Sequence, residues 1–70
     1  MRARELLKIL RDKGCVELRQ EGSHVRVQCG KCFTTVSTHK GEEIGKGLLH
    51  KIERDCEACL GKDWLKKARE

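Results

Sequence analysis

Residues 15–37 narrow the possible folds more than any other part of the chain, because apolar and polar side chains alternate there in three short runs. Alternation with a period of two is typical of a strand that has one covered face. The runs predict strands over residues 15–20, 24–29 and 32–37, joined by turns at 21–23 and 30–31. Gly30, at the first position of a two-residue loop, suits a type II′ hairpin turn. We therefore expect three consecutive antiparallel strands.

The tight second turn also fixes which side chains share a face of this sheet. A two-residue loop makes Cys29 and Cys32 direct cross-strand neighbours, so both side chains lie on one side. The same side then receives the more apolar members of the alternation: Val25, Val27, Cys29, Cys32, Thr34 and Val36. The opposite side receives His24, Arg26, Gln28, Phe33, Thr35 and Ser37. We expect helices to cover the first side and to leave the second side open.

Two helical patterns flank the strands. Before them, apolar residues recur at i, i+3, i+4 and i+7 in a segment that Gly14 ends, namely Ala3, Leu6, Leu7 and Leu10. After a polar loop over residues 38–47 a second apolar stripe runs up to Gly61, namely Leu48, Leu49, Ile52, Cys56 and Cys59. Trp64 and Leu65 are expected to anchor a short C-terminal turn on the core. The pattern predicts an α+β fold of order α-β-β-β-α, with two helices on one face of a three-stranded antiparallel sheet, as in double-stranded-RNA-binding domains.

The composition is basic, with sixteen Lys and Arg residues against eleven Asp and Glu residues and a formal net charge of +5. This charge favours an anionic partner such as nucleic acid, although the same value is normal for a small soluble domain. Seventy residues predict one domain over residues 1–70. The charged N-terminal segment does not resemble a signal peptide, and no apolar run is long enough to cross a bilayer. We therefore expect a cytoplasmic protein with no membrane partner.

Several segments in this order resemble the HicA toxins of bacterial and archaeal toxin–antitoxin systems. They span roughly residues 3–60 and comprise residues 5–10, Gly14, residues 19–24, residues 34–36, His39 and Gly47. The most specific element is the sequence Gly22-Ser23-His24 at the start of the second predicted strand. The chain departs from the family pattern in two places. Ser37 stands where relatives often have proline, and cysteines flank the turn at residues 30–31, where relatives commonly have plain turn residues.

The resemblance implies the toxin component of a type II toxin–antitoxin system. Such a toxin is an endoribonuclease that cleaves mRNA without a metal and is neutralised by a HicB-type antitoxin covering its active site. The resemblance assigns the catalytic role to His24. The residues support this independently, because alternation places His24 on the uncovered face beside Arg26, and imidazole can transfer protons near neutral pH. The alternative is a histidine that merely completes the turn after Ser23.

The other candidate RNA contacts are cations, small turn residues and one further histidine. They are Gly22, Ser23, Arg26, Lys31, His39, Lys40 and Lys46. Each cation could instead be a solvated surface charge, and His39 could equally organise its loop by hydrogen bonding. Lys46 stands where free N–H groups of the second helix favour a phosphate. Gly22 is interpreted as a position of positive φ or of close approach by the RNA backbone.

The cysteines form two C-x2-C pairs, Cys29 with Cys32 and Cys56 with Cys59, in the pattern of a structural zinc site. The predicted topology returns both pairs to the same end of the domain. They could instead be small core residues or an oxidised pair, and Cys15 is expected to be a plain core residue. A four-cysteine zinc would stabilise the fold and would leave no open position for catalysis. The rival hypothesis builds on such a zinc site. It is a non-catalytic RNA-binding module stabilised by a structural zinc, which would bind RNA without cleaving it.

Overall fold

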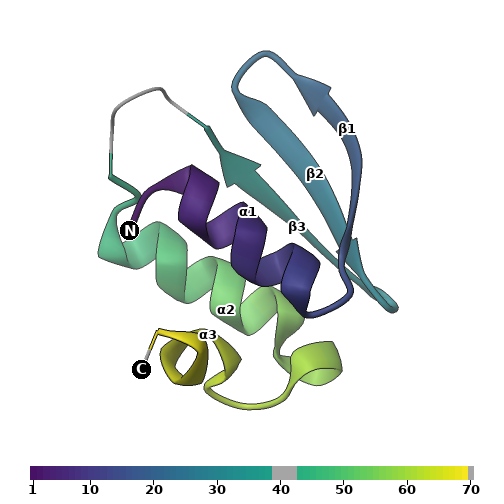
Figure 1. The fold of residues 1–70 in the computed structure, drawn as a ribbon, viewed down its shortest axis with the longest axis vertical. Coiled ribbons are helices and arrows are strands. Elements are labelled where there is room, and N and C mark those ends of the chain that lie inside the picture. Colours follow the sequence, from purple (N-terminus) through teal and green to yellow (C-terminus); the bar gives the residue numbers. More distant parts are fainter. Residues whose placement is uncertain (39–42, 70) are drawn as a thin grey trace.

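The computed structural model describes residues 1–38 and 43–69. Its elements follow the chain in the order α1 (Ala3–Asp12), β1 (Val16–Glu21), β2 (His24–Cys29), β3 (Cys32–Ser37), α2 (Lys46–Leu60) and α3 (Trp64–Ala68). The predicted α-β-β-β-α order and the α+β class are therefore confirmed, and the expected C-terminal turn is the short helix α3 (Figure 1). No helix in the described part of the chain is long and apolar enough to cross a membrane.

The three strands form an antiparallel sheet in the order β1-β2-β3. Strand β3 pairs with β2 without irregularity from His24↔Ser37 to Cys29↔Cys32, which is the register expected from the two-residue loop. Gly30 in that loop has φ +61°, as a type II′ turn requires, and Gly22 in the first turn has φ +57°. Both values lie in the left-handed region that favours glycine. The two glycines therefore permit the tight reversals that set the register.

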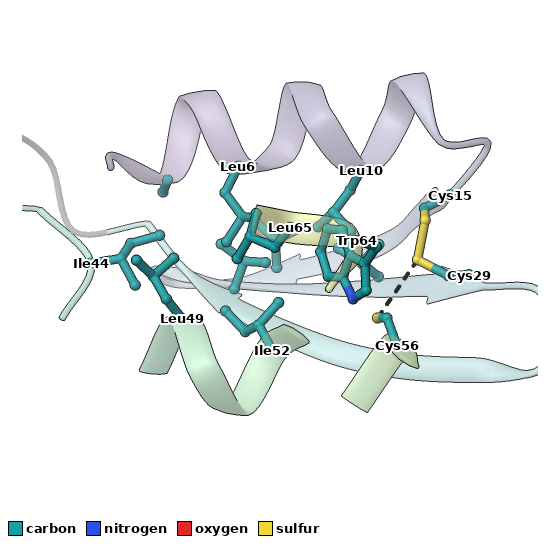
Figure 2. Close-up of a cluster of buried hydrophobic side chains, with 14 residues drawn as sticks. Leu6, Leu10, Cys15, Cys29, Ile44, Leu49, Ile52, Cys56, Trp64 and Leu65 are labelled. Carbon is teal, nitrogen blue, oxygen red and sulfur yellow. Dashed lines mark hydrogen bonds between the residues drawn. A yellow bond between two sulfur atoms is a disulfide. The ribbon is translucent and has the colours of Figure 1, made fainter. Parts of the chain in front are cut away.

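Helices α1 and α2 lie beside each other over the same face of the sheet (Figure 1). The strand side chains beneath them are buried, as the alternation predicts, with Val25, Val27, Cys29, Thr34 and Val36 all 3% exposed or less. The helices contribute a second layer to this core, with fully buried side chains at Leu6, Leu10, Ile52, Cys56 and Trp64 (Figure 2). The opposite face of the sheet carries none of the helices (Figure 1).

Strand β1 differs from the other two, because all six of its residues are exposed. The register shifts between Glu17 and Arg19, so that Val16 lies opposite Gln28 while Arg19 lies opposite Arg26. A bulge of this kind adds one residue to a strand and reverses the faces of the residues beyond it. The bulge therefore brings Arg19 to the open face, opposite Arg26. Glu17, which precedes the bulge, forms an exposed ion pair of 3.6 Å with Arg11 of α1.

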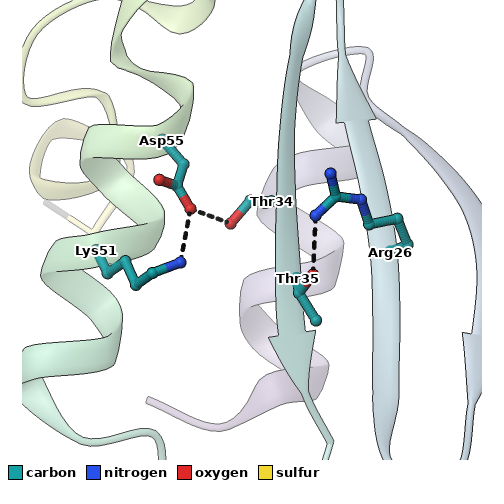
Figure 3. Close-up of polar contacts among 5 residues, drawn as sticks. All are labelled: Arg26, Thr34, Thr35, Lys51 and Asp55. Atoms are coloured by element: carbon teal, nitrogen blue, oxygen red, sulfur yellow. Dashed lines mark hydrogen bonds and ion pairs between the residues drawn. The ribbon is translucent and has the colours of Figure 1, made fainter.

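Polar contacts fasten α2 to its neighbours on both sides. The Thr34 hydroxyl donates a hydrogen bond of 3.1 Å to Asp55 Oδ2, which also lies 3.4 Å from Lys51 Nζ (Figure 3). On the other side the indole N–H of Trp64 donates to the carbonyl oxygen of Glu53 at 2.8 Å. Loss of either partner would leave a donor unpaired and destabilise the fold, so these contacts hold α2 in place between β3 and α3.

The five cysteines gather at one end of the molecule, as predicted for the two C-x2-C pairs. Disulfides join Cys15 to Cys29 and Cys32 to Cys59, leaving Cys56 as a buried free thiol. Cys15 is buried as expected, but it is cross-linked and so is not the plain core residue that its sequence context predicted. Disulfides of this kind typically stabilise a fold by about 2–4 kcal/mol each.

Candidate functional site

The histidine singled out by sequence is the first residue of β2, and its side chain is exposed on the open face. Its cross-strand neighbours are Glu21 on β1 and Ser37 on β3. The turn before it is held from both sides. The Gln20 amide donates to the carbonyl oxygen of Gly22 at 3.0 Å, and the hydroxyl of Thr38 donates to that of Ser23 at 3.0 Å. The backbone that carries His24 therefore has a defined position although the side chain is open to solvent.

A shallow hollow of about 150 Å³ surrounds this histidine. It is lined by Arg19, Glu21, His24, Arg26 and Thr35. Two of these side chains are cations, one is an anion and one is a hydroxyl, so the hollow can offer both charge and hydrogen bonds to a bound group. An imidazole next to guanidinium groups is an arrangement able to bind a phosphate and to move a proton beside it.

Arg26 is held in place by two neighbours on β3. Its Nη1 donates a hydrogen bond of 3.1 Å to the Thr35 hydroxyl (Figure 3), and its guanidinium carbon lies 5.2 Å from the centre of the Phe33 ring. A cation over an aromatic ring is attracted to the face of that ring. Thr35 accepts from one nitrogen of a group that has five N–H donors, which leaves donors for an anionic ligand. These contacts restrict the rotamers of a side chain that would otherwise be fully mobile.

Arg19 reaches the same hollow from the edge strand. It lies opposite Arg26 in the sheet, and its Nε is 3.2 Å from Glu21 Oε1. The site residues predicted from the sequence did not include Arg19, Glu21 or Thr35, which line the hollow. Thr35 could have been found from the alternation, because it shares the face and the neighbourhood of Arg26. Arg19 depends on pairing across β1, which the sequence did not resolve.

The other predicted RNA contacts do not all join this hollow. Lys46, the first residue of α2, lines a separate hollow of about 480 Å³ between α2 and α3, together with His50 and Lys66 among others. Lys31 is exposed in the hairpin at the far end of β2 from the histidine. Gly22 and Ser23 adjoin the site through the turn. His39 and Lys40 lie outside the described residues.

The four predicted zinc ligands lie at the same end of the molecule, and three of them are oxidised in disulfides, whereas Cys56 is a free thiol. Among residues 1–38 and 43–69 no group of three or more His, Cys, Asp or Glu side chains is arranged to hold a metal ion. A disulfide sulfur is not a thiolate, and cysteine ligates zinc as the thiolate. Burial, and to a lesser degree the charge of Asp55, raises the pKa of the remaining Cys56 thiol. Metal binding by these cysteines remains a prediction.

The fold and the hollow together define a small α+β protein with a basic, histidine-bearing patch on an uncovered sheet. The family model described as "HicA toxin of bacterial toxin-antitoxin" matches residues 3–58. The chain belongs to this family, and membership implies an antitoxin partner. No curated protein and no solved structure matches the chain.

Proposed function

We propose that this member of the HicA family is an endoribonuclease that cleaves mRNA, with His24 as its catalytic residue. The observation that carries the proposal is the exposed imidazole in a hollow that also contains Arg19 and Arg26. An RNA phosphodiester is an anion whose cleavage needs a proton carrier and a cation near the phosphate. The hollow supplies both from side chains alone, which supports cleavage without a metal cofactor.

In the proposed reaction the ribose 2′-oxygen attacks the neighbouring phosphorus. His24 either removes the 2′-hydroxyl proton or donates a proton to the departing 5′-oxygen as the P–O5′ bond breaks. The products would be a 2′,3′-cyclic phosphate and a free 5′-hydroxyl. Arg26, held by Thr35, would bind the phosphate oxygens as negative charge accumulates on them, and Arg19 would assist from the opposite strand.

The RNA would lie across the open face of the sheet and near the turn formed by Gly22 and Ser23. His39, Lys40 and Lys46, from the segment that leads into α2, are proposed as further contacts with the RNA. A HicB-type antitoxin would neutralise the toxin by covering the same face, which is exposed and carries no helix. The natural setting of such a pair is the cytoplasm, where its mRNA substrate is found.

The direct test is cleavage of a defined mRNA by the purified protein, with His24→Ala compared with His50→Ala. Both histidines are exposed, but His50 lines the separate hollow between α2 and α3. Loss of cleavage in His24→Ala, retention in His50→Ala and unchanged circular dichroism of both variants are expected. Cleavage should continue when EDTA is present. A His24→Ala variant that cuts as fast as the parent would overturn the catalytic assignment.

The second candidate is a non-catalytic RNA-binding module. One observation favours it: the residues lining a second hollow include the cations Lys46, Lys66 and Arg69 but not His24. Such a module would bind RNA with a steep dependence on salt and leave it intact. Expression in cells distinguishes the two functions. Growth arrest on expression that disappears with His24→Ala and is relieved by a co-expressed antitoxin supports the nuclease.

A further inference from the structure

Four of the five cysteines form a compact quartet built from two separate elements. Cys29 and Cys32 face each other across the β2–β3 hairpin, and Cys56 and Cys59 lie in the last turns of α2. Each cysteine of the hairpin also contacts one cysteine of α2. Cys29 Sγ is 3.8 Å from Cys56 Sγ, and Cys32 is bonded to Cys59. Figure 2 shows the first of these contacts beside the bond from Cys29 to Cys15.

One sulfur–sulfur separation in the quartet, between Cys29 and Cys56, matches what zinc requires. A tetrahedral ion with Zn–S bonds of about 2.3 Å separates its ligand sulfurs by about 3.8 Å. Cys29 and Cys56 already stand at that separation, with the Cys56 thiol donating a hydrogen bond to Cys29 Sγ and no covalent bond between the two sulfurs. Cys32 and Cys59 are closer because they share a bond, and they need only move apart once it is broken. The hairpin loop is also seated against the helix, since a Cβ on Gly30 would lie 3.7 Å from Cys59 Sγ.

Burial argues against the view that these are ordinary core cysteines. Cys29 and Cys56 are buried, but Cys59 is exposed and Cys32 is only half-buried. The quartet therefore extends from the core to the surface at the end of the sheet, where an ion can enter. Lys31, exposed in the loop between the two strand cysteines, brings positive charge close to a tetrathiolate centre, which would carry net negative charge.

We propose that Cys29, Cys32, Cys56 and Cys59 bind one zinc ion when the disulfides are reduced. A dithiol reductant supplies two electrons and two protons to each disulfide and is itself oxidised to a disulfide. The four thiols then lose their protons as their sulfurs bind the metal. Cys15 is left as a free thiol, because Cys29 cannot be bonded to it and ligate zinc together. The metal and disulfide forms are alternatives that tie the same hairpin to the same helix, and neither depends on the proposed nuclease activity.

The test is titration of the reduced full-length chain with cobalt(II), which reports a tetrahedral tetrathiolate site by its absorption spectrum, followed by displacement with zinc. One cobalt per chain is expected. Cys59→Ser should weaken binding at least tenfold, and because this side chain is exposed the fold should tolerate the change. Cys15→Ser is the matched control. It removes a disulfide partner that lies outside the quartet, so it should bind metal as the parent does.

Oxidation offers an independent readout. A thiol oxidant should release the bound zinc from the parent as the Cys15–Cys29 bond forms, and a chromogenic chelator would measure the release. Absence of a tetrathiolate spectrum in the reduced parent would overturn the proposal. So would equal metal binding by Cys59→Ser and the parent, or loss of metal in Cys15→Ser as large as in Cys59→Ser.

Discussion

The contact between Thr34 and Asp55 allows a stability prediction that can be worked from the structure. Thr34 is the buried polar side chain in the core of the described residues, at 1% exposure, and it donates to a carboxylate at 3.1 Å. A hydrogen bond to a charged group contributes roughly 1.5–3 kcal/mol. Asp55 keeps 30% of its side-chain surface exposed and retains Lys51 at 3.4 Å, so water and the lysine will compensate for part of the loss.

Thr34→Val removes the hydroxyl while keeping the shape of the side chain. The new methyl group is buried and recovers up to about 0.8 kcal/mol. The expected net cost is therefore about 1 kcal/mol in the free energy of unfolding, or a fall in Tm of roughly 4–8 °C for a chain of this size. Urea unfolding followed by circular dichroism, with the disulfides intact, measures it directly.

Two comparisons make the result decisive. Thr35→Val, one residue along β3, breaks an exposed hydrogen bond to Arg26 and should change stability by less than about 0.5 kcal/mol. A double-mutant cycle with Asp55→Asn should give a favourable coupling energy between Thr34 and Asp55. If Thr34→Val is as stable as the parent, or the coupling is zero, the hydroxyl only offsets its own burial and does not fasten α2 to β3.

Three further outcomes are expected. Arg26→Ala should slow RNA cleavage about tenfold to hundredfold. Arg26→Lys should restore only part of the rate, because lysine returns the charge without the planar guanidinium group. Equal cleavage rates of an oligonucleotide by the parent and Arg26→Ala would contradict this. Gly22→Ala should lower stability by about 1 kcal/mol, because φ is +57° and a Cβ would meet nothing within 4 Å, so the cost is conformational; an unchanged thermal melt would contradict it. Trp64→Phe removes the donor to the Glu53 carbonyl oxygen and should cost about 1–3 kcal/mol in the same assay, with a neutral result excluding a structural role for that bond.

The faces of β2 and β3 were predictable from sequence because a two-residue loop leaves a single register. Once Cys29 and Cys32 are opposite each other, strict alternation decides that His24 and Arg26 are exposed. The family was also predictable, because its motif lies at a defined place within that pattern.

Strand β1 was less predictable, since both of its faces are exposed and no burial pattern fixes its register. Its bulge, and with it the place of Arg19 in the hollow, comes from pairing rather than from local preference. The link between Cys15 and Cys29 was missed for a related reason. It joins residues 14 apart in the chain, and sequence does not reveal which of five cysteines will meet.

The bulge in β1 has a consequence for how the molecule opens. It brings Arg19 beside Arg26, while Glu17, before the bulge, joins the strand to α1 only by an exposed ion pair, an interaction that adds little stability. No buried side chain anchors this strand, so its amide protons should exchange with solvent well before those of β2 and β3. Arg19 and Glu21 belong to this strand, so one side of the histidine hollow is formed by the strand of the sheet that is expected to open most readily. A ligand that binds both Arg19 and Arg26 would hold β1 against β2 and so slow amide exchange in β1.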